Sequence, residues 1–284
     1  MPYIGKKSLG QHFLTCAWVG ETLVHTADIS RSDTILEIGP GKGALTRLLA
    51  SRAARVIAVE KDERLAEALE KDLQSRTIKN VEIIPGDILT LCPRLSLGQG
   101  YKVVANIPYY LTSRLLRLLL EGERKPALMA LTIQKEVAER IVAKPPRMNP
   151  ALTLNRTGHT IKYKKSKGGM NLLALSVQAY GKPEIIKTVP ASCFSPKPKV
   201  DSAIIKISDI SDRYFKTNSI SEEKFFRLVK QSFSQKRKVL TNTFPPPKSK
   251  GAALLKRLNL SPNVRAEELS LNEWAQIVKE WYTT

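Results

Sequence analysis

The sequence predicts an α/β protein with a doubly wound, mostly parallel sheet, followed by a small all-helical domain. Strand and helix patterns alternate from Thr34 to about Gln134, which is typical of a parallel sheet with helices on both faces. From about Ser208 onward no strand pattern remains. With 284 residues, the chain is long enough for one large and one small domain. We therefore expect a first domain of residues 1–208 and a helical domain of residues 209–284.

The first predicted strand, residues 34–38, runs into a glycine-rich turn, Gly39-Pro40-Gly41-Lys42-Gly43. Glycines allow the backbone to pass close to a ligand where a Cβ would clash. A helix is predicted at residues 44–50, and a second strand then ends at Glu60. An acidic residue about 20 positions after such a turn is placed to bind ribose hydroxyls. This order indicates an adenosine-containing cofactor, either NAD or S-adenosylmethionine.

A third strand, residues 81–84, is followed by Gly86-Asp87. The Asp87 carboxylate is placed to accept a hydrogen bond from the adenine amine of such a cofactor. The alternative is that Asp87 caps the N-terminus of the next helix, a position that aspartate favours. The two interpretations are compatible.

The fourth predicted strand, residues 102–105, ends in Asn106-Ile107-Pro108-Tyr109. The Asn side-chain oxygen and a following carbonyl can accept hydrogen bonds from a base NH2 group. Proline fixes the backbone that carries these acceptors, and tyrosine offers a face for stacking. The alternative is an ordinary Pro-containing turn after a core strand. The turn suits a base amine and no histidine pairs with an acid, so we favour S-adenosylmethionine and methyl transfer over NAD and hydride transfer.

The remaining patterns complete the predicted fold. Three further strands are expected at residues 127–133, 184–189 and 202–207. Helices are expected at residues 63–74, 112–120, 134–142, 172–180, 221–233, 251–260 and 265–281.

Composition points to a polyanionic partner. The formal net charge is +20 and the pI is about 9.9, and such an excess of Lys and Arg most often serves nucleic-acid binding. No apolar run reaches the roughly 18 residues that span a bilayer, and the N-terminus lacks a signal-peptide core. The cysteines, Cys16, Cys92 and Cys193, are scattered and odd in number. We therefore expect a monomer in a reducing cytoplasm, with no metal site and no membrane partner.

Several motifs in order make the chain resemble the KsgA-type ribosomal RNA adenine dimethyltransferases. The motifs are Gly10-Gln11-His12-Phe13-Leu14, Glu37-Ile38-Gly39-Pro40-Gly41, Val59-Glu60, Gly86-Asp87, Asn106-Ile107-Pro108-Tyr109, Gln134-Lys135-Glu136-Val137, the run from Phe194 to Ser202, and Phe233-Ser234-Gln235-Lys236-Arg237-Lys238. The resemblance implies a methyltransferase sheet with a helical RNA-binding domain behind it. It also implies S-adenosylmethionine-dependent dimethylation of two adjacent adenosines near the 3′ end of small-subunit rRNA, in an assembling small subunit.

The resemblance also implies roles for individual residues. The methyl donor would contact His12, Leu14, Gly39, Glu60, Asp87 and Asn106. The target adenine would be held by Asn106 and by a carbonyl of Ile107 or Pro108, with Tyr109 stacked on one face and Phe194 on the other. Basic residues near the target pocket and in the helical tail are expected to contact RNA: Lys197, Lys199, Lys236, Arg237 and Lys238.

Three other functions stay open at this level. Large-subunit rRNA methylases of the erythromycin-resistance type share the Asn-Ile-Pro-Tyr turn. DNA adenine methyltransferases use the same chemistry but typically read Asp-Pro-Pro-Tyr. A non-catalytic RNA-binding or ribosome-assembly factor on the same fold is the third.

The segment of about residues 150–171 departs from the family pattern, has five basic and no acidic residues, and follows Met148-Asn149, which recurs as Met170-Asn171. We interpret it as an insertion in a surface loop.

Overall fold

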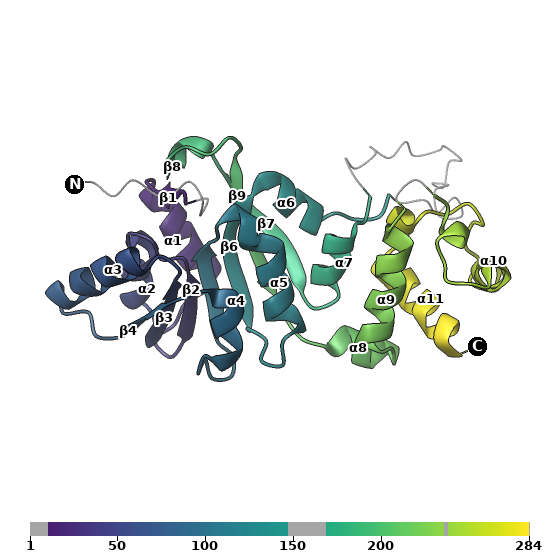
Figure 1. The fold of residues 1–284 in the computed structure, drawn as a ribbon, viewed down its shortest axis with the longest axis horizontal. Helices are drawn as coiled ribbons and strands as arrows, with labels where there is room; N and C mark the ends of the chain where they lie inside the picture. Colours follow the sequence, from purple (N-terminus) through teal and green to yellow (C-terminus); the bar gives the residue numbers. More distant parts are fainter. Residues whose placement is uncertain (1–10, 147–168, 236–237, 284) are drawn as a thin grey trace, which may run out of the picture. The chain divides into compact units, whose positions relative to one another are not determined.

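The computed structural model describes residues 11–146, 169–235 and 238–283 of the chain. The described residues fold into two compact units (Figure 1). The first runs to Glu139 and includes Gly181–Ser211, whereas the second comprises Arg140–Tyr180 and Asp212–Thr284. All the strands of the described chain belong to the first unit, and the second is helical.

The first unit is built around a sheet in which the described chain supplies seven strands, in the order β4-β3-β2-β5-β6-β9-β7 (Figure 1). The strands are β2 (Thr34–Ile38), β3 (Arg55–Glu60), β4 (Val81–Pro85), β5 (Lys102–Asn106), β6 (Leu128–Gln134), β7 (Lys182–Val189) and β9 (Ser202–Ser208). Neighbouring strands from β4 across to β6 are parallel, whereas β9 is antiparallel to both β6 and β7. The predicted mostly parallel α/β fold is confirmed.

The order of the strands reverses between β2 and β5, which lie side by side. From β2 the chain proceeds outward to β3 and β4, and it then returns to place β5 and β6 on the other side. In open α/β sheets, ligands bind outside the carboxyl ends of the strands at such a reversal. The glycine turn follows β2 and Asn106 ends β5, so both sequence motifs lie at this point.

The central strands are apolar on both faces because helices cover both faces of a parallel sheet. Val103, Val104 and Ala105 of β5 are fully buried, and Ala130 on the neighbouring β6 is paired with Val104. Helix α1 (Ala17–Thr26) contributes Val19 and Leu23 to the same core. The sequence analysis did not predict this helix.

Local sequence explains the other helices of the first unit. They are α2 (Ala44–Ala50), α3 (Glu63–Ser75), α4 (Ile88–Leu91), α5 (Thr112–Glu121) and α6 (Lys135–Ile141), which leads into the second unit. In α3, the Asp62 carboxylate caps the helix by accepting from the Arg64 N–H. Leu65, Leu69 and Leu73 recur every four residues and form its buried face.

A two-stranded antiparallel ribbon joins segments far apart in the sequence. Strand β1 (Phe13–Leu14) pairs with β8 (Phe194–Ser195), which follows a short 3-10 turn, η5 (Ala191–Cys193). A disulfide links Cys16 to Cys193 directly beside this ribbon. Scattered cysteines and an expected reducing environment did not predict this bridge: the two residues are 177 positions apart, and only the folding of β1 against β8 makes them neighbours.

The second unit packs helices around an aromatic core. Its helices are α7 (Leu172–Gln178), α8 (Arg213–Asn218), α9 (Glu222–Phe233), α10 (Lys248–Arg257) and α11 (Leu271–Thr283). Phe215, Phe225 and Phe226 contact one another edge-on or tilted, and Trp274 is fully buried. The short helix α8 was not predicted. No helix of the described residues is long and apolar enough to cross a membrane.

Among the described residues, those at 140–146 and 169–180 group with the helical unit, although they precede the boundary expected at residue 208. Helix α7 packs against α9, and the Tyr180 hydroxyl donates to the Glu222 carboxylate. The proposed insertion of residues 150–171 lies outside the described residues except for its last three. Of these, Met170 is buried and its N–H donates to the Glu267 carbonyl.

Candidate functional site

The glycine turn between β2 and α2 has a backbone that other residues rarely adopt. Gly39, Gly41 and Gly43 have φ values of +68°, +57° and +75°, in the left-handed region that favours glycine. A Cβ on Gly41 would lie 2.9 Å from the Phe13 ring, which packs over the turn from β1. The glycines therefore let the turn lie close beneath the β1–β8 ribbon.

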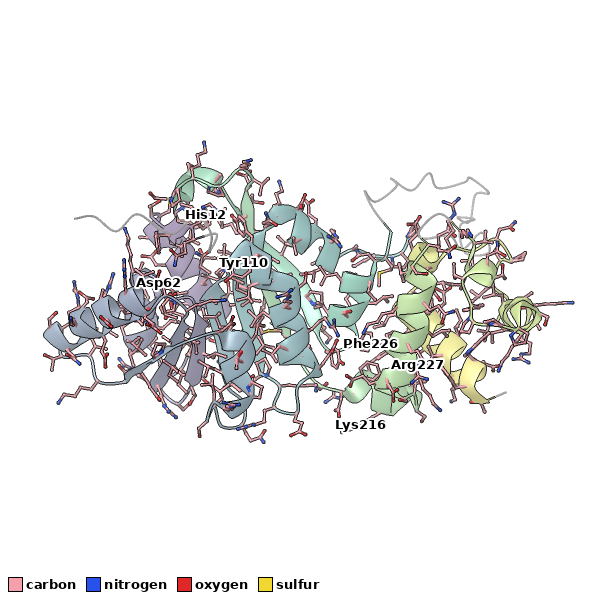
Figure 2. The ribbon with its side chains drawn as sticks, in the orientation of Figure 1. His12, Asp62, Tyr110, Lys216, Phe226 and Arg227 are labelled. Atoms are coloured by element: carbon pink, nitrogen blue, oxygen red, sulfur yellow. A yellow bond between two sulfur atoms is a disulfide. The ribbon has the colours of Figure 1, made fainter. Side chains whose placement is uncertain are left out.

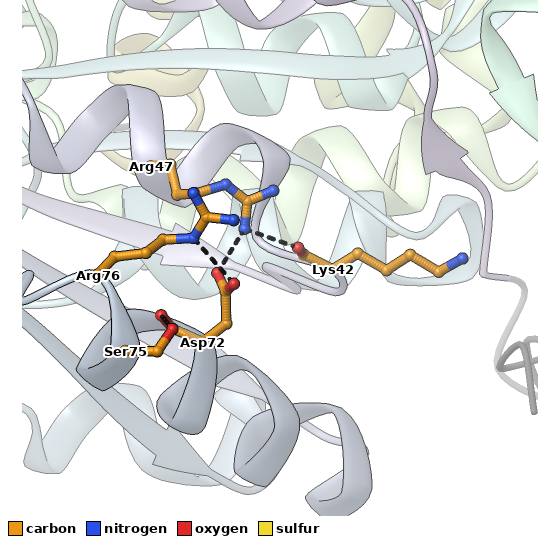
Figure 3. Close-up of polar contacts among 5 residues, drawn as sticks. All are labelled: Lys42, Arg47, Asp72, Ser75 and Arg76. Atoms are coloured by element: carbon orange, nitrogen blue, oxygen red, sulfur yellow. Dashed lines mark hydrogen bonds and ion pairs between the residues drawn. The ribbon is translucent and has the colours of Figure 1, made fainter.

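A polar cluster on α2 and α3 braces the outer side of this turn (Figure 3). The Arg47 guanidinium donates to the Lys42 carbonyl at 3.2 Å and to the Asp72 carboxylate at 3.0 Å. Arg76 donates to the other Asp72 oxygen at 2.9 Å. The pairs are partly exposed, so they orient the turn more than they stabilise the fold.

Glu60, at the end of β3, is the buried acid predicted to bind ribose hydroxyls. Its side chain is 4% exposed. One carboxylate oxygen accepts from the Gly41 N–H at 3.0 Å and the other from the Asp62 N–H at 2.9 Å. Burial raises the pKa of Glu60, while these backbone donors favour its charged form. A carboxylate has about four acceptor positions, and those that the backbone donors leave open can accept from a ribose hydroxyl.

Replacing Glu60 with alanine is expected to weaken S-adenosylmethionine binding by more than tenfold. A hydrogen bond to a charged group contributes about 1.5–3 kcal/mol, and the substitution removes the acceptor. Isothermal titration calorimetry measures the loss directly. Glu82→Ala on the adjacent β4 is the matched control, because Glu82 is exposed. Unchanged affinity in a folded Glu60→Ala protein would exclude Glu60 from the donor site.

Glu37, on the central strand β2, is a second buried acid beside the site. It is 1% exposed, and its Oε2 has no hydrogen-bond partner among the described residues. Burial is the largest cause that raises the pKa of Glu37 to about 8, with the nearby charge of Glu60 adding to it. Glu37 is therefore protonated in the folded protein at neutral pH.

The pKa of Glu37 predicts a pH-dependent stability. Because the folded-state pKa lies above the usual value of 4.5, the unfolded chain loses this proton first. Its contribution to stability is thus complete below pH 4.5 and is lost as the pH rises towards 8. The free energy of unfolding should fall by up to about 1.4 kcal/mol per pH unit in this window from Glu37 alone.

Urea unfolding of Glu37→Gln at several pH values between 4.5 and 8 tests this prediction. The glutamine does not titrate, so the variant should gain stability relative to wild type as the pH rises. Glu82→Gln, at an exposed position, is expected to follow wild type across the window. Parallel pH profiles for Glu37→Gln and wild type would contradict the raised pKa.

Asp87 lies after β4 and has two partners in the structure. One oxygen accepts from the Leu89 N–H at 3.0 Å, which caps α4, and the other pairs with the Lys61 ammonium at 2.8 Å. The hydrogen bond from Lys61 is the main cause that lowers the pKa of Asp87. The capping interpretation is confirmed. Lys61 was not among the predicted site residues, although its position directly after Glu60 places it at the same end of β3.

Asn106 ends β5 and is oriented by the N-terminal segment. Its side-chain nitrogen donates to the His12 carbonyl at 3.0 Å. A carbonyl only accepts, so the Asn106 Oδ1 must face the other way and remains an acceptor for an incoming donor. The Pro108 carbonyl accepts from the Leu111 N–H at 2.9 Å. We therefore favour Ile107 over Pro108 as the source of the second acceptor.

The two tyrosines that follow have different surroundings. Tyr109 is half-buried, its hydroxyl lies 2.8 Å from the Ser202 hydroxyl, and its ring centroid is 5.4 Å from that of His12. Tyr110 is 54% exposed. The pKa of Lys61 is raised, mainly by its hydrogen bond to Asp87, and Tyr110 lies close enough to add to this effect. Figure 2 labels His12 on the segment leading into β1 and Tyr110 in the turn before α5. The sequence analysis assigned no role to Tyr110.

One pocket at the carboxyl ends of β2 and β5 collects most of the predicted site residues. His12, Leu14, Gly39, Glu60, Asp87, Asn106, Pro108 and Tyr109 all line it. Lys42, Lys61 and Tyr110 line it as well, and Glu37 forms part of its wall. Among the described residues, no group of three or more His, Cys, Asp and Glu side chains is arranged to hold a metal ion.

Phe194 does not line this pocket. It is 3% exposed and packs in the core cluster with Val19, Leu23 and Cys193. Its apolar ring is satisfied by that core, where it supports the strand pairing of β8 with Leu14 of β1. The ring therefore lies in the core of this structure, and the expected stacking of Phe194 on the target adenine stays a prediction.

The predicted RNA-binding lysines fall in two places. Lys197 and Lys199 are exposed on the loop after β8, whose Pro196 carbonyl accepts from His12 Nδ1 at 2.6 Å. Lys238 is exposed in the second unit after α9. Lys236 and Arg237 lie outside the described residues.

Comparisons with known proteins show the family to which the chain belongs. The family model for ribosomal RNA adenine dimethylase matches residues 4–160 and 163–283. The ribosomal RNA small subunit methyltransferase A of Dehalococcoides mccartyi is 40% identical over 278 residues, covering 96% of this chain and 87% of the relative. The protein of the same name from Fusobacterium nucleatum is 37% identical over 283 residues, which cover 98% of this chain and 98% of the relative.

Two solved structures have folds similar to that of this chain. A dimethyladenosine transferase from Plasmodium falciparum superimposes with a TM-score of 0.75 at 26% identity, covering 96% of this chain and 98% of that one. The 23S rRNA methyltransferase ErmE superimposes with a TM-score of 0.67 at 23% identity, covering 94% and 98%, which shows a shared fold. With its motifs gathered in one pocket and a family match over nearly its whole length, the chain belongs to the ribosomal RNA adenine dimethylases.

Proposed function

We propose that this protein transfers methyl groups from S-adenosylmethionine to the exocyclic amines of two adjacent adenosines near the 3′ end of small-subunit (16S) rRNA, as a step in small-subunit biogenesis. The observation that carries the proposal is the arrangement at Asn106. Its amide is held by the His12 carbonyl so that Oδ1 is presented as an acceptor, in the same pocket as the buried carboxylate of Glu60.

The donor half of the pocket fits an adenosine-containing methyl donor. Gly39 and Gly41 both have positive φ values, and a Cβ on Gly41 would clash with the Phe13 ring at 2.9 Å, so glycine keeps this side of the pocket open. Glu60 would hold the ribose hydroxyls, and Asp87 would accept from the adenine amine beside Lys61. When bound, S-adenosylmethionine supplies an electrophilic methyl group. His12 and Leu14 would close this half of the pocket from β1 and its leading segment.

The target half would act by orientation. The adenine amine is a poor nucleophile because its lone pair is delocalised into the ring. Asn106 Oδ1 and the Ile107 carbonyl would each accept one N–H of this amine and direct its lone pair towards the donor. The nitrogen that receives the methyl group becomes positively charged, and this cation is acidic enough to lose a proton to water without a dedicated base. Tyr109 would stack on the base, which must leave its own stack to enter the pocket. Orientation of this kind can supply roughly 7–11 kcal/mol.

The RNA partner is supported by charge. The chain carries a net charge of +20, and Lys197 and Lys199 are exposed on the loop that contacts His12. We place Lys238 of the helical unit on the RNA as well, together with the neighbouring Lys236 and Arg237. Phosphate contacts of this kind make binding fall steeply with salt. We place the protein in the cytoplasm, where small subunits assemble.

The experiment that tests the proposal uses methyl-labelled S-adenosylmethionine. The purified protein is incubated separately with immature small subunits, large subunits, free small-subunit rRNA and duplex DNA, and the labelled base is mapped. Two neighbouring dimethyladenosines near the 3′ end of the small-subunit rRNA are expected. Label on large-subunit rRNA would favour the erythromycin-resistance type instead, and label on DNA would exclude an RNA methylase. No transfer with any substrate would favour a non-catalytic assembly factor.

A further inference from the structure

Two consecutive polar residues, Asp201 just before β9 and Ser202 at its first position, make hydrogen bonds in different directions. The Ser202 hydroxyl, which is fully buried, lies 2.8 Å from the Tyr109 hydroxyl. Asp201 is exposed, and its Oδ1 accepts from the Ala191 N–H at 3.0 Å. Because successive side chains of an extended chain point to opposite sides, this dipeptide can reach both places at once.

Ser202 stands at a position where packing alone favours an apolar side chain. The next residues of β9, Ala203 and Ile204, are fully buried like Ser202 itself. Burying a hydroxyl is costly unless it is hydrogen-bonded, and Tyr109 provides that partner. The same bond anchors the far end of the Tyr109 ring, whose face lies beside His12. The ring is thereby held in one orientation at the target half of the pocket.

Asp201 places a negative charge two residues after Lys199, in a loop that is expected to bind a polyanion. The hydrogen bond that Asp201 accepts from the Ala191 N–H gives a structural reason for an acidic residue at this position. Ala191 begins the turn η5, which leads directly into β8. Strand β8 pairs with β1, and Phe13 of β1 packs over Gly41 in the glycine turn. Asp201 thus fixes the start of the segment that supports the ribbon over the donor half.

We propose that Asp201 and Ser202 are positioning residues for methyl transfer: Ser202 aligns Tyr109 for the target adenine, and Asp201 holds the β8–β1 ribbon over the donor. The proposal rests on the proposed function for the role of Tyr109. It separates the two halves of the pocket, since Ser202 should affect turnover on RNA and Asp201 should affect donor binding.

The Ser202 half is tested by a double-mutant cycle with Tyr109→Phe, which keeps the ring and removes the hydroxyl. Ser202→Ala and Tyr109→Phe are each expected to lower kcat on RNA about tenfold, with the donor Kd within about twofold of wild type. The double variant should lose no more than either single variant, because both remove the same bond. Ser232→Ala, a buried serine in the other unit whose hydroxyl has no partner among the described residues, should retain full kcat.

Losses that multiply to about a hundredfold in the double variant would overturn the Ser202 half, as would a normal kcat in Ser202→Ala. A merely structural role would lower the melting temperature and the donor affinity together, which would also contradict it. The double-mutant cycle requires that the wild-type protein transfers methyl groups to RNA. If wild type transfers no methyl group, the proposed function itself fails, and the Asp201 half is still decided by donor binding.

The Asp201 half is tested by comparing Asp201→Ala with Asp201→Asn. Asparagine keeps an oxygen that can accept from the Ala191 N–H, whereas alanine does not. Asp201→Ala should weaken S-adenosylmethionine binding about fivefold, and Asp201→Asn should restore it to within about twofold of wild type. Equal losses in both variants would show that the charge matters and not the hydrogen bond. No loss in either would show that the turn needs no such support.

Discussion

Asn106→Ala is expected to lower turnover at saturating RNA and donor about a hundredfold, while RNA affinity changes less than about threefold. The Asn106 acceptor matters most as the transition state forms, because only then does the amine lone pair turn towards the methyl group. Some loss of donor affinity should accompany this effect, since the His12 carbonyl also loses its partner. Single-turnover kinetics with labelled donor, together with RNA-binding titrations, measure the two effects separately.

The control for this variant is Asn272→Ala, which removes an exposed amide from α11 in the second unit. It should leave both turnover and RNA affinity unchanged. An Asn106→Ala enzyme with near-normal turnover would rule out the orientation mechanism. An equal loss of RNA affinity and turnover would instead assign Asn106 to uniform substrate binding.

Reduction of the Cys16–Cys193 disulfide is expected to lower the melting temperature of the protein by roughly 10–20 °C. The bridge joins residues 177 positions apart, and closing a loop of this length removes much of the entropy of the unfolded chain. The loop-entropy relation gives a stabilisation of about 5 kcal/mol. For chains of 150–250 residues, each 1 kcal/mol shifts the midpoint by about 2–4 °C. Thermal melts with and without a thiol reductant measure the effect.

Two serine variants make the melting experiment specific. Cys16→Ser should melt low with or without reductant, because it cannot form the bridge. Cys92→Ser should keep the full response to reductant, because Cys92 is the cysteine of the described chain that has no disulfide partner. A wild-type protein whose melting temperature ignores the reductant would show that the bridge does not stabilise the fold.

Much of the donor site could be predicted from the sequence because its determinants are local. The glycine turn and Glu60 belong to one strand–turn–helix–strand unit, in which short-range geometry places the acid beside the turn. The Asn106-Ile107-Pro108-Tyr109 turn is likewise contiguous. The parallel sheet followed from the alternation of patterns, and the family resemblance followed from motif order. Glu60, for example, lies only 19 positions after the Gly41 N–H that it accepts from.

Only the tertiary structure decided the features that depend on distant pairing. Cys16 and Cys193 carry no spacing signal, and the β1–β8 ribbon alone brings them together. Phe194 was expected in the pocket, but the side to which a two-residue strand directs its ring depends on its pairing register, and it lies in the core. The bond from Ser202 to Tyr109 joins residues 93 positions apart. Local sequence sets which residues can do the chemistry, whereas long-range strand pairing sets which of them meet, because a contact between distant segments has no local pattern of its own.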